Sequence, residues 1–446
     1  MIVPGQLLIR ARFSDAVASV RVPRGRRRGR EQTRKAHWRE LDKLLEAIHA
    51  VAISRVHDPI PLWQLRHPRW SRSKRRLDSA FLIRFDADRI EPERALATMR
   101  EWKRVVSAEL NRFVVVHATP AIGVSQPGVP PWGHQIELAR AWGFTRGDPR
   151  VTVAVIDSGI AANHIAFANS LRLEPGCDVV DVSGVSLPHD REWIGDVDQP
   201  DDQPADDVGH GTHMSALVAG AGFGVAPGVR VMPIRALAGI RLNSGELMAM
   251  GKQDDLARAI RFAVDKQAVI LNCSYGNAAV GVVGPGQIEQ DAIDDAVSAG
   301  CFVAAAMGND GNLDQPKFPA RFESVCGVAA IDSDDTRWLE SSSEGSQRGF
   351  HCDLSAPGVH IEGASHQGGS ELRTGTSAAT AIVSGAAALV QSFALDRLHA
   401  VLPGEDLGRL LTSSARRLWD GSAPRHQDFG FGCINPAAAM DTLIET

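Results

Sequence analysis

Polar side chains end three apolar or glycine-rich stretches of the chain. The run VTVAVID, residues 151–157, ends in Asp157, the stretch GHGTHM places His210 between two glycines, and the sequence GTS places Ser377 at the start of an Ala-rich helical pattern. Because reactive groups in an open parallel sheet collect beyond the carboxyl ends of the strands, we expect these side chains to lie close together. A carboxylate, an imidazole and a hydroxyl are the parts of a nucleophilic triad.

Each of these residue types has a separate task in such chemistry. A serine hydroxyl is too weakly acidic to attack an amide unless a neutral imidazole accepts its proton in the transition state. The imidazole in turn needs a buried carboxylate that fixes its tautomer. A helix that begins at Ser377 would direct backbone N–H groups toward the developing oxyanion, and Asn309, which follows the run CFVAAAMG, could donate a side-chain N–H to the same oxygen.

The elements that would position these residues follow from the apolar pattern. Short runs rich in Val, Ile and Ala predict strands that alternate with amphipathic helices, as a doubly covered parallel sheet requires. We therefore expect a three-layer α/β domain over residues 135–446. Its strands are predicted at 151–157, 229–237, 268–274, 301–306 and 324–331, and its helices near 213–221, 253–266 and 288–299.

The N-terminal third has a different pattern. Residues 1–118 predict a small α+β domain, and residues 119–134, rich in Pro and Gly, predict a linker. Within the small domain, strands are predicted at 5–12, 79–86 and 113–117, and helices at 37–52 and 92–102.

The charge is distributed unevenly between these two parts. Residues 1–118 hold 26 of the 48 Lys and Arg and 13 of the 53 Asp and Glu, which leaves 22 basic and 40 acidic residues in 119–446. Opposite charges on one chain indicate either two domains that dock on each other or a basic arm for nucleic acid. The tract RGRRRGR at 24–30 has neither interleaved aromatic residues nor a recognition helix, so we expect a solvated segment and no nucleic-acid partner.

Composition bounds the remaining possibilities. No run of about 18 apolar residues is found, and the first residues lack the zones of a signal peptide, so we expect no membrane partner and a cytoplasmic location. The six cysteines never form a CxxC pair, which favours buried thiols over disulfides or zinc ligands. We expect no cofactor; the acidic run at 195–207 fits a solvated loop better than a calcium site, because its spacing matches no EF-hand.

Four blocks together resemble a known family. VAVIDSGI, GHGTHMSALVAG, AAAMGND and GTSAATAIVSGAAALV, in this order, closely resemble the signature blocks of the subtilisin-like serine proteases, and the resemblance runs from about Trp132 to Asn435. It implies a parallel seven-stranded sheet and endopeptidase activity through an acyl-enzyme. It makes Asp157 the orienting carboxylate, His210 the general base and acid, Ser377 the nucleophile and Asn309 the oxyanion donor.

The same resemblance implies the walls of a substrate cleft. One wall holds Ser274, Tyr275 and Gly276; the opposite wall holds Ala305, Ala306 and Gly308; and Asp310 and Lys317 shape the base of the primary specificity pocket. If Lys317 projects inward, a small or acidic residue is expected before the scissile bond. The Phe318–Pro319 bond is expected to be cis, as at the corresponding step of the family.

Two features qualify the resemblance. In the family the catalytic serine is usually followed by Met-Ala-Thr-Pro-His, whereas residues 378–382 here are AATAI. The resemblance therefore does not define the start of this helix or the leaving-group side of the cleft. Many secreted members carry a strand-helix-strand prosegment whose last strand lies in the cleft until it is cut, and FVVVH at 113–117 resembles that strand. The alternatives are a protein of the same fold whose N-terminal domain recruits a partner without catalysis, and an esterase or ligase that uses the same triad.

Overall fold

The central element of the computed structural model is a seven-stranded parallel sheet. The structure describes residues 2–11, 39–57, 79–117, 121–123, 128–168, 172–198, 200–277, 286–311 and 316–445, so the basic tract at 24–30 lies outside the described residues. The strand order is β18-β15-β14-β12-β6-β9-β7, which confirms the predicted parallel sheet. Its strands are β6 (Thr152–Asp157), β7 (Cys177–Asp178), β9 (Arg230–Arg235), β12 (Ile270–Cys273), β14 (Phe302–Ala306), β15 (Cys326–Ile331) and β18 (Leu354–Pro357).

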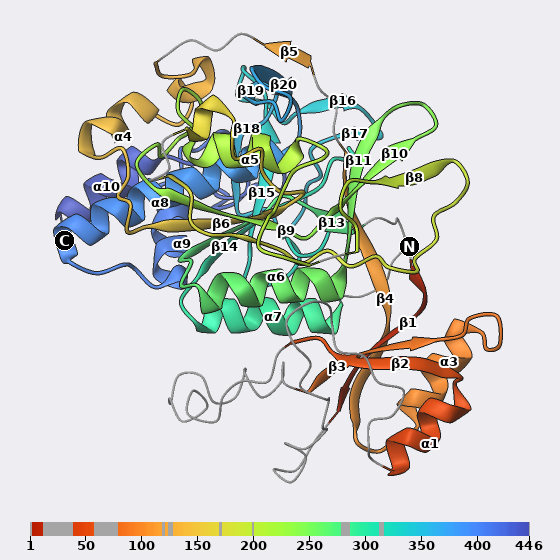
Figure 1. Cartoon of the computed structure of the whole chain (residues 1–446). Helices are drawn as coiled ribbons and strands as arrows, with labels where there is room; N and C mark the ends of the chain where they lie inside the picture. The colour runs from red at the N-terminus through yellow and green to blue at the C-terminus, as the bar shows by residue number, and fades with distance from the viewer. Residues whose placement is uncertain are drawn as a thin grey trace.

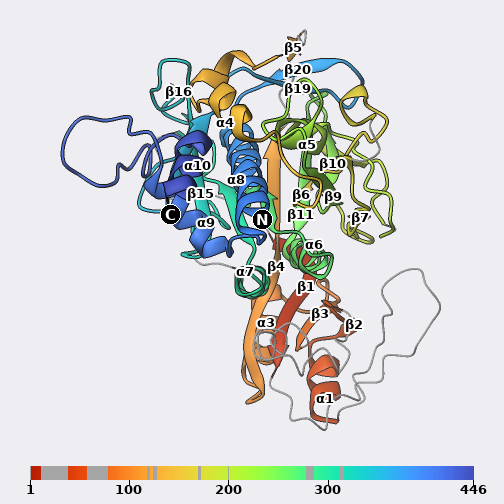
Figure 2. The ribbon, with the colours of Figure 1, turned by 90° about the vertical axis from the view of Figure 1, so that its left-hand side faces the viewer.

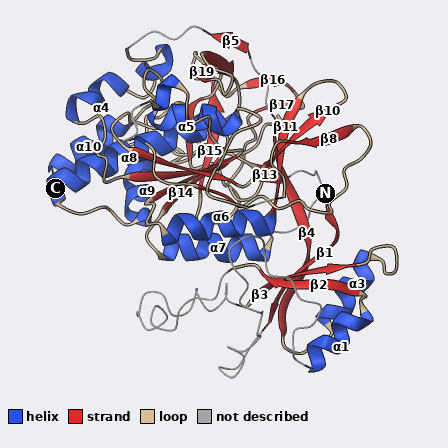
Figure 3. Ribbon diagram, in the orientation of Figure 1, coloured by secondary structure: helices blue, strands red, loops and turns tan. Residues whose placement is uncertain are grey.

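Helices cover both faces of this sheet, as Figures 1 and 3 show. One face packs against α6 (Gln253–Asp265) and α7 (Gln287–Ser298). The other face packs against α5 (His210–Ala219) and α8 (Thr376–Leu398), with α4 (Leu138–Phe144), α9 (Gly404–Ser413) and α10 (Pro436–Glu445) outside them. The strands are buried on both sides, which is why their sequences are continuously apolar rather than alternating.

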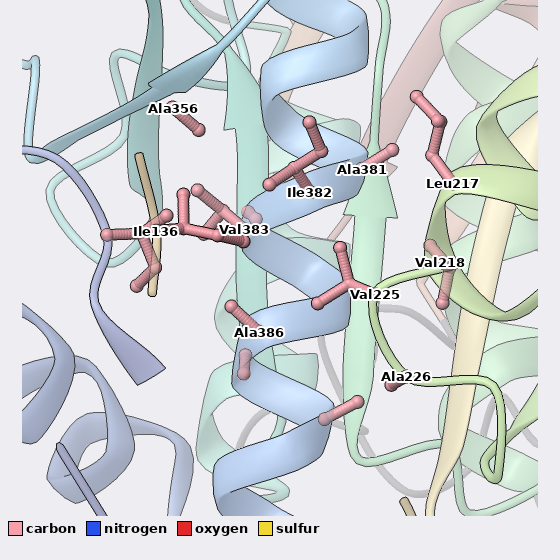
Figure 4. Packing of buried hydrophobic residues seen from close by; sticks show 14 of the residues in the cluster. Ile136, Leu217, Val218, Val225, Ala226, Ala356, Ala381, Ile382, Val383 and Ala386 are labelled. Carbon is pink, nitrogen blue, oxygen red and sulfur yellow. The ribbon is translucent and has the colours of Figure 1, made fainter. Parts of the chain in front are cut away.

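The longest helix is the centre of one core layer. Among the described residues, α8 alone is long and apolar enough to span a membrane, and 89% of its most apolar window is buried inside the protein. Figure 4 shows Ile382, Val383 and Ala386 of α8 between Ile136 on one side and Leu217 and Val218 of α5 on the other. Its Ala and Gly residues leave no bulk between helix and sheet, so Ser377 starts from a rigid support.

The N-terminal domain is an antiparallel sheet covered by two helices on one side. It contains β1 (Ile2–Ala11), α1 (Arg39–Ala47), β2 (Ala50–Arg55), β3 (Ala80–Phe85), α3 (Pro92–Arg100) and β4 (Val105–His117), with strand order β2-β3-β1-β4. The helix predicted at 37–52 is too long, because residues 50–55 form β2 and pair with β3. The last strand is also longer than the predicted 113–117.

Strand β4 connects the two domains, and Figures 1 and 2 show it rising from the small domain into the large one. Its first half pairs with β1, and its second half pairs with β11 (Leu247–Lys252) and β13 (Gly276–Asn277). Strands β10 (Ala238–Leu242) and β8 (Arg191–Ile194) continue this second sheet.

The remaining strands form two small sheets. A third sheet joins β19 (Ile361–Ala364), β20 (Ser370–Arg373) and β5 (Ala121–Gly123), and β16 (Leu339–Ser341) pairs with β17 (Glu344–Gly345). The segment predicted as a linker therefore contains β5, together with a 3-10 turn at Pro131–His134. All six cysteines are free and the Phe318–Pro319 bond is cis, as predicted.

Candidate active site

The three predicted triad residues converge at one edge of the parallel sheet. Asp157 is the last residue of β6, His210 is the first residue of α5, and Ser377 is the second residue of α8. His210 Nδ1 lies 2.7 Å from Asp157 Oδ1, and the side chains of both residues are buried. His210 and Ser377 line the same pocket, where Ser377 Oγ donates a hydrogen bond of 3.1 Å to the Ser274 carbonyl oxygen. Rotation of the Ser377 side chain is therefore required before its hydroxyl can serve the imidazole.

The turn after β6 fixes the carboxylate. The Ser158 backbone N–H donates to Asp157 Oδ1 at 2.7 Å, and the Gly211 N–H donates to Ser158 Oγ at 2.9 Å. Gly159 has φ +114° and packs so closely against the loop at 204–205 that a Cβ would lie 2.5 Å from the Ala205 carbonyl oxygen. Only glycine allows this turn, which brings the ends of β6 and α5 together.

Asp206 is a further residue that holds this junction, and the sequence did not identify it. Its Oδ1 accepts hydrogen bonds from Ser158 Oγ (2.9 Å) and the Gly209 N–H (2.8 Å), and its Oδ2 accepts from the N–H (2.8 Å) and hydroxyl (2.6 Å) of Thr212. Burial opposes ionisation, but these hydrogen bonds, those from Thr212 above all, lower the pKa of Asp206 below its ordinary value. The signal available in the sequence was an Asp just before a helix, which is a common N-cap.

The predicted oxyanion donor is held by the residue before the serine. Asn309 Oδ1 accepts from the N–H (3.0 Å) and hydroxyl (2.8 Å) of Thr376. The amide oxygen is thus occupied, and Asn309 Nδ2 would lie 3.1 Å from a Cβ placed on Gly375, two residues before Ser377. The Ser377 N–H lies in the first turn of α8, where it has no partner within the helix, and together with Asn309 Nδ2 it can serve as an oxyanion donor. Thr376 is the second positioning residue that the sequence did not reveal.

Most of the predicted cleft residues line a single pocket. The pocket that contains Ser377 is also lined by Ser274, Tyr275, Gly276, Ala306, Gly308, Asp310 and Lys317. Ala305 is an exception: it is fully buried in β14, in the core on the α6 and α7 side, and does not line this pocket. Alternate residues of a strand point to opposite faces, so Ala305 and Ala306 cannot share one environment.

The base of the pocket is an ion pair. Lys317 Nζ lies 2.7 Å from Asp310 Oδ2, and both side chains are partly exposed. The Lys317 stem packs across Gly276, where a Cβ would lie 2.7 Å from the Cβ of Lys317. Because Asp310 neutralises the ammonium group, the unpaired positive charge that would favour an acidic substrate residue is absent.

The N-terminal domain enters the same cleft. Val115 of β4 pairs with Gly276 of β13 and with Met250 of β11, so β4 lies between the two as a central strand. Val115 and Val116 line the pocket with Ser377, and the space left there is only about 80 Å³. The cleft is therefore filled by the chain's own segment.

His213, the second histidine of the GHGTH block, has a structural place. It is fully buried, and its Nε2 lies 3.1 Å from the Ile361 carbonyl oxygen and 3.3 Å from that of Glu371. Burial, with the nearby Arg373 charge, lowers the pKa of His213 well below its ordinary value, so the ring is neutral. It ties α5 to the β19–β20 hairpin.

The acidic run at 195–207 is more structured than the predicted solvated loop. Asp206 accepts the Thr212 N–H in the first turn of α5 at 2.8 Å, and Asp207 pairs with the buried Arg235 at 3.2 Å. Within the described residues there is no group of three or more His, Cys, Asp or Glu side chains that could hold a metal ion.

Known proteins share this sequence pattern and arrangement. A family model described as the subtilase family matches residues 148–432. Subtilisin DY of Bacillus licheniformis is 30% identical over 297 residues, covering 65% of this chain and 90% of its own length. Thermitase of Thermoactinomyces vulgaris is 29% identical over 264 residues, covering 58% of this chain and 80% of its own.

Two further comparisons differ in coverage. Subtilisin-like protease 4 of Trichophyton equinum is 30% identical over 281 residues, and the match spans 61% of this chain and 62% of that protein's length. The solved structure of the prenylagaramide maturation protease PagA has a TM-score of 0.53 and 28% identity, and covers 69% of this chain and 98% of that one. The family model matches more than half of the chain, in the region that carries the Asp157, His210 and Ser377 geometry. The chain belongs to the subtilase family.

Proposed function

We propose that this protein is a serine endopeptidase that cleaves peptide bonds through an acyl-enzyme on Ser377. The observation that carries the proposal is the 2.7 Å contact between Asp157 and His210 in a cleft that also holds Ser377 and Asn309. His210 accepts the hydroxyl proton as Ser377 attacks the carbonyl carbon, and returns that proton to the leaving amine. Asn309 Nδ2 and the N–H groups at the start of α8 stabilise the oxyanion, and water then hydrolyses the acyl-enzyme.

A fluorophosphonate probe tests this proposal directly. Labelling of the wild type that disappears in Ser377→Ala supports the activated nucleophile. A wild type that is not labelled after removal of the N-terminal domain supports the alternative, a subtilase-fold protein that recruits a partner without catalysis. Hydrolysis of ester but not peptide substrates by a labelled protein would instead support the esterase alternative.

The second part of the proposal is that residues 1–118 act as an inhibitory or folding prosegment. Besides filling the cleft with β4, this domain docks on α6 and α7. Glu109 accepts the backbone N–H groups of Gln287 (3.0 Å) and Ile288 (3.2 Å) at the start of α7, and Asn111 donates to Asp254 at 2.8 Å. An ion pair between Arg10 and Asp291 joins the same surfaces, which fits the opposite charges of the two domains.

The strand register supports self-processing at one bond. Gly276 is opposite Val115, and continuing this antiparallel pairing by two residues brings His117 opposite Ser274, whose carbonyl accepts the Ser377 hydroxyl. The peptide bond that follows His117 is then the one presented to the nucleophile. Mass spectrometry should find a new N-terminus at Ala118 in the wild type and none in Ser377→Ala. A terminus elsewhere would contradict this register.

A further inference from the structure

Strand β4 presents apolar side chains on both of its faces where it enters the cleft. Val114 and Val116 belong to the core cluster that also contains Tyr275 and the apolar face of α6. Phe113 and Val115 belong to a second cluster, in which Phe113 is only 3% exposed. Successive side chains of a strand point to opposite faces, which explains this alternation. The segment in the cleft is therefore covered by protein on two sides.

The second cluster is formed largely by the catalytic domain. We define the outer wall as these residues of that domain within the cluster: Val180, Val182, Val185, Trp193, Met248 and Met250. The valines come from the segment between β7 and β8, the tryptophan from β8 and the methionines from β11. Figure 1 shows β8, β10 and β11 beside the part of β4 that lies in the large domain.

Strand pairing places this wall directly beside alternate residues of β4. Met250 of β11 is opposite Val115, and directly opposite residues of an antiparallel pair have their side chains on the same face. Trp193 lies two strands further along the same sheet, and its ring centroid is 6.3 Å from that of Phe113 at an interplanar angle of 48°. This distance is within the range of attractive aromatic pairs.

Hydrogen bonds within the catalytic domain fix the shape of the outer wall. The Val182 N–H donates to the Val197 carbonyl oxygen at 2.8 Å, and Trp193 Nε1 donates to the Val185 carbonyl oxygen at 3.0 Å. Neither bond involves the N-terminal domain. A wall that is ordered by its own contacts can bind a side chain without a large loss of conformational entropy.

We propose that the outer wall is a side-chain binding site of the protease cleft, which takes an aromatic residue at the fifth position and a branched aliphatic residue at the third position before the scissile bond. The proposal rests on the protease function and on the cleavage after His117 proposed above. Counted from that bond, Val115 is the third residue and Phe113 the fifth. An extended peptide that replaces β4 beside β11 presents the same alternate side chains to the wall.

The composition of the wall suits this ligand. Without an occupant, its valines, methionines and tryptophan would leave a contiguous apolar patch in contact with water, which is unfavourable on a soluble protein. Methionine side chains adapt to the shape of a ring and make favourable sulfur–aromatic contacts. The ligand is therefore a peptide with apolar residues at both positions, one of them aromatic.

Peptide pairs that differ only at the fifth position test the site with the full-chain enzyme. The wild type should cleave the peptide with Phe there with a kcat/KM about tenfold higher than that of the same peptide with Ser. In Trp193→Ala this ratio should fall to about twofold. The control is Trp419→Ala, whose ring stacks on Phe429 and does not line the cleft pocket; its ratio should equal that of the wild type.

A ratio is used because it cancels differences in the amount of active enzyme between preparations. A wild-type ratio near one, or an unchanged ratio in Trp193→Ala, would overturn the proposal. At the third position, a preference of about three- to fivefold for Val over Ser should disappear in Met250→Ser. A preference that survives this change would overturn the assignment of the third position.

Hydrogen exchange in the Ser377→Ala chain tests the wall without catalysis. Phe113→Ser removes the ring from the wall, so the amides of β11 should exchange about tenfold faster. Val106→Ser changes an exposed residue of the same strand and should leave this exchange within about twofold. Unchanged protection in Phe113→Ser would overturn the proposal. If the wild type neither labels with fluorophosphonate nor cleaves peptides, the protease proposal fails, whereas faster exchange in Phe113→Ser still supports binding of an apolar segment by the outer wall.

Discussion

At the scale of single residues, Asn309 can act only if Thr376 keeps its amide oxygen occupied. Replacing Asn309 by Ala should lower kcat by about 10²- to 10³-fold, because one oxyanion donor is lost. Thr376→Val removes a hydroxyl that donates to Asn309 and accepts the Gly308 N–H at 3.2 Å, and it should lower kcat by about three- to tenfold with KM unchanged.

The double variant is the control for this pair. Because Thr376 acts through Asn309, the loss in Asn309→Ala/Thr376→Val should be no larger than in Asn309→Ala alone. Steady-state kinetics with one peptide substrate would measure all three variants. Multiplicative losses would mean that Thr376 acts elsewhere.

The Lys317–Asp310 pair gives a second prediction at this scale. Asp310→Asn leaves the Lys317 ammonium without its carboxylate at the base of the pocket. The ratio of kcat/KM for substrates with Glu and Gln before the scissile bond should rise by about three- to tenfold, since a partly exposed pair contributes up to about 1 kcal/mol. In Lys317→Met the ratio should not rise, and an unchanged ratio in Asp310→Asn would show that the pair does not face the substrate.

At the scale of elements, Asp206 couples the end of β6 to the start of α5. Asp206→Asn loses an acceptor and a negative charge at a helix N-terminus, so the free energy of unfolding should fall by about 2 kcal/mol at pH 7. Because the pKa of Asp206 is lowered in the native protein, the stabilisation is present above its unfolded pKa and is lost as pH falls.

Asp202→Asn is the matched control, because it removes the same charge from an exposed position of the same loop. Urea titrations at pH 7 and at about pH 2.5, below the ordinary pKa of Asp, would compare the two variants. The difference between Asp206→Asn and the wild type should shrink at the lower pH. A constant difference would show that the charge of Asp206 is not responsible.

At the scale of the whole molecule, the buried Glu289, which lies near Glu109 of the N-terminal domain, makes the free energy of unfolding depend on pH. Burial, and then repulsion from Glu109 of the N-terminal domain, raises the pKa of Glu289 to about 8, although the nearby polar groups of Tyr275 and Gln253 act in the opposite direction. Between the ordinary pKa of Glu and about pH 8, the Glu289 carboxyl is therefore protonated in the native chain and ionised in the unfolded chain.

The free energy of unfolding should consequently fall as pH rises through this window and level off above pH 8. Glu289→Gln should flatten the decline and be more stable than the wild type at pH 8.5 by up to a few kcal/mol. Urea unfolding at pH 5.5, 7 and 8.5 would measure this, with the exposed Glu340→Gln as the control. Parallel profiles for Glu289→Gln and the wild type would contradict the assignment.

The sequence by itself determined the parallel sheet and pointed to the three residues that we propose as the triad. Short runs that are apolar at every position and alternate with helical patterns favour strands buried on both faces, and polar residues at the carboxyl ends of parallel strands gather at one edge. Local pattern also located α5, α6 and α7 to within a few residues. The pattern was misleading at residues 50–52, which were predicted as the end of a helix. Residues 50–55 instead form β2, because they pair with β3.

Only the tertiary structure decided which groups meet across long sequence separations. The contacts of Asp206 with Ser158, of Thr376 with Asn309 and of Lys317 with Asp310 depend on distances that no local pattern encodes. The same is true of the place of β4 between β11 and β13. Backbone pairing is nearly independent of side-chain type, so the sequence around Ala121 could not indicate that it forms a strand on β20. Local sequence determines which residues of a strand or helix are buried. The packing of the whole chain determines which residues far apart in the sequence come into contact.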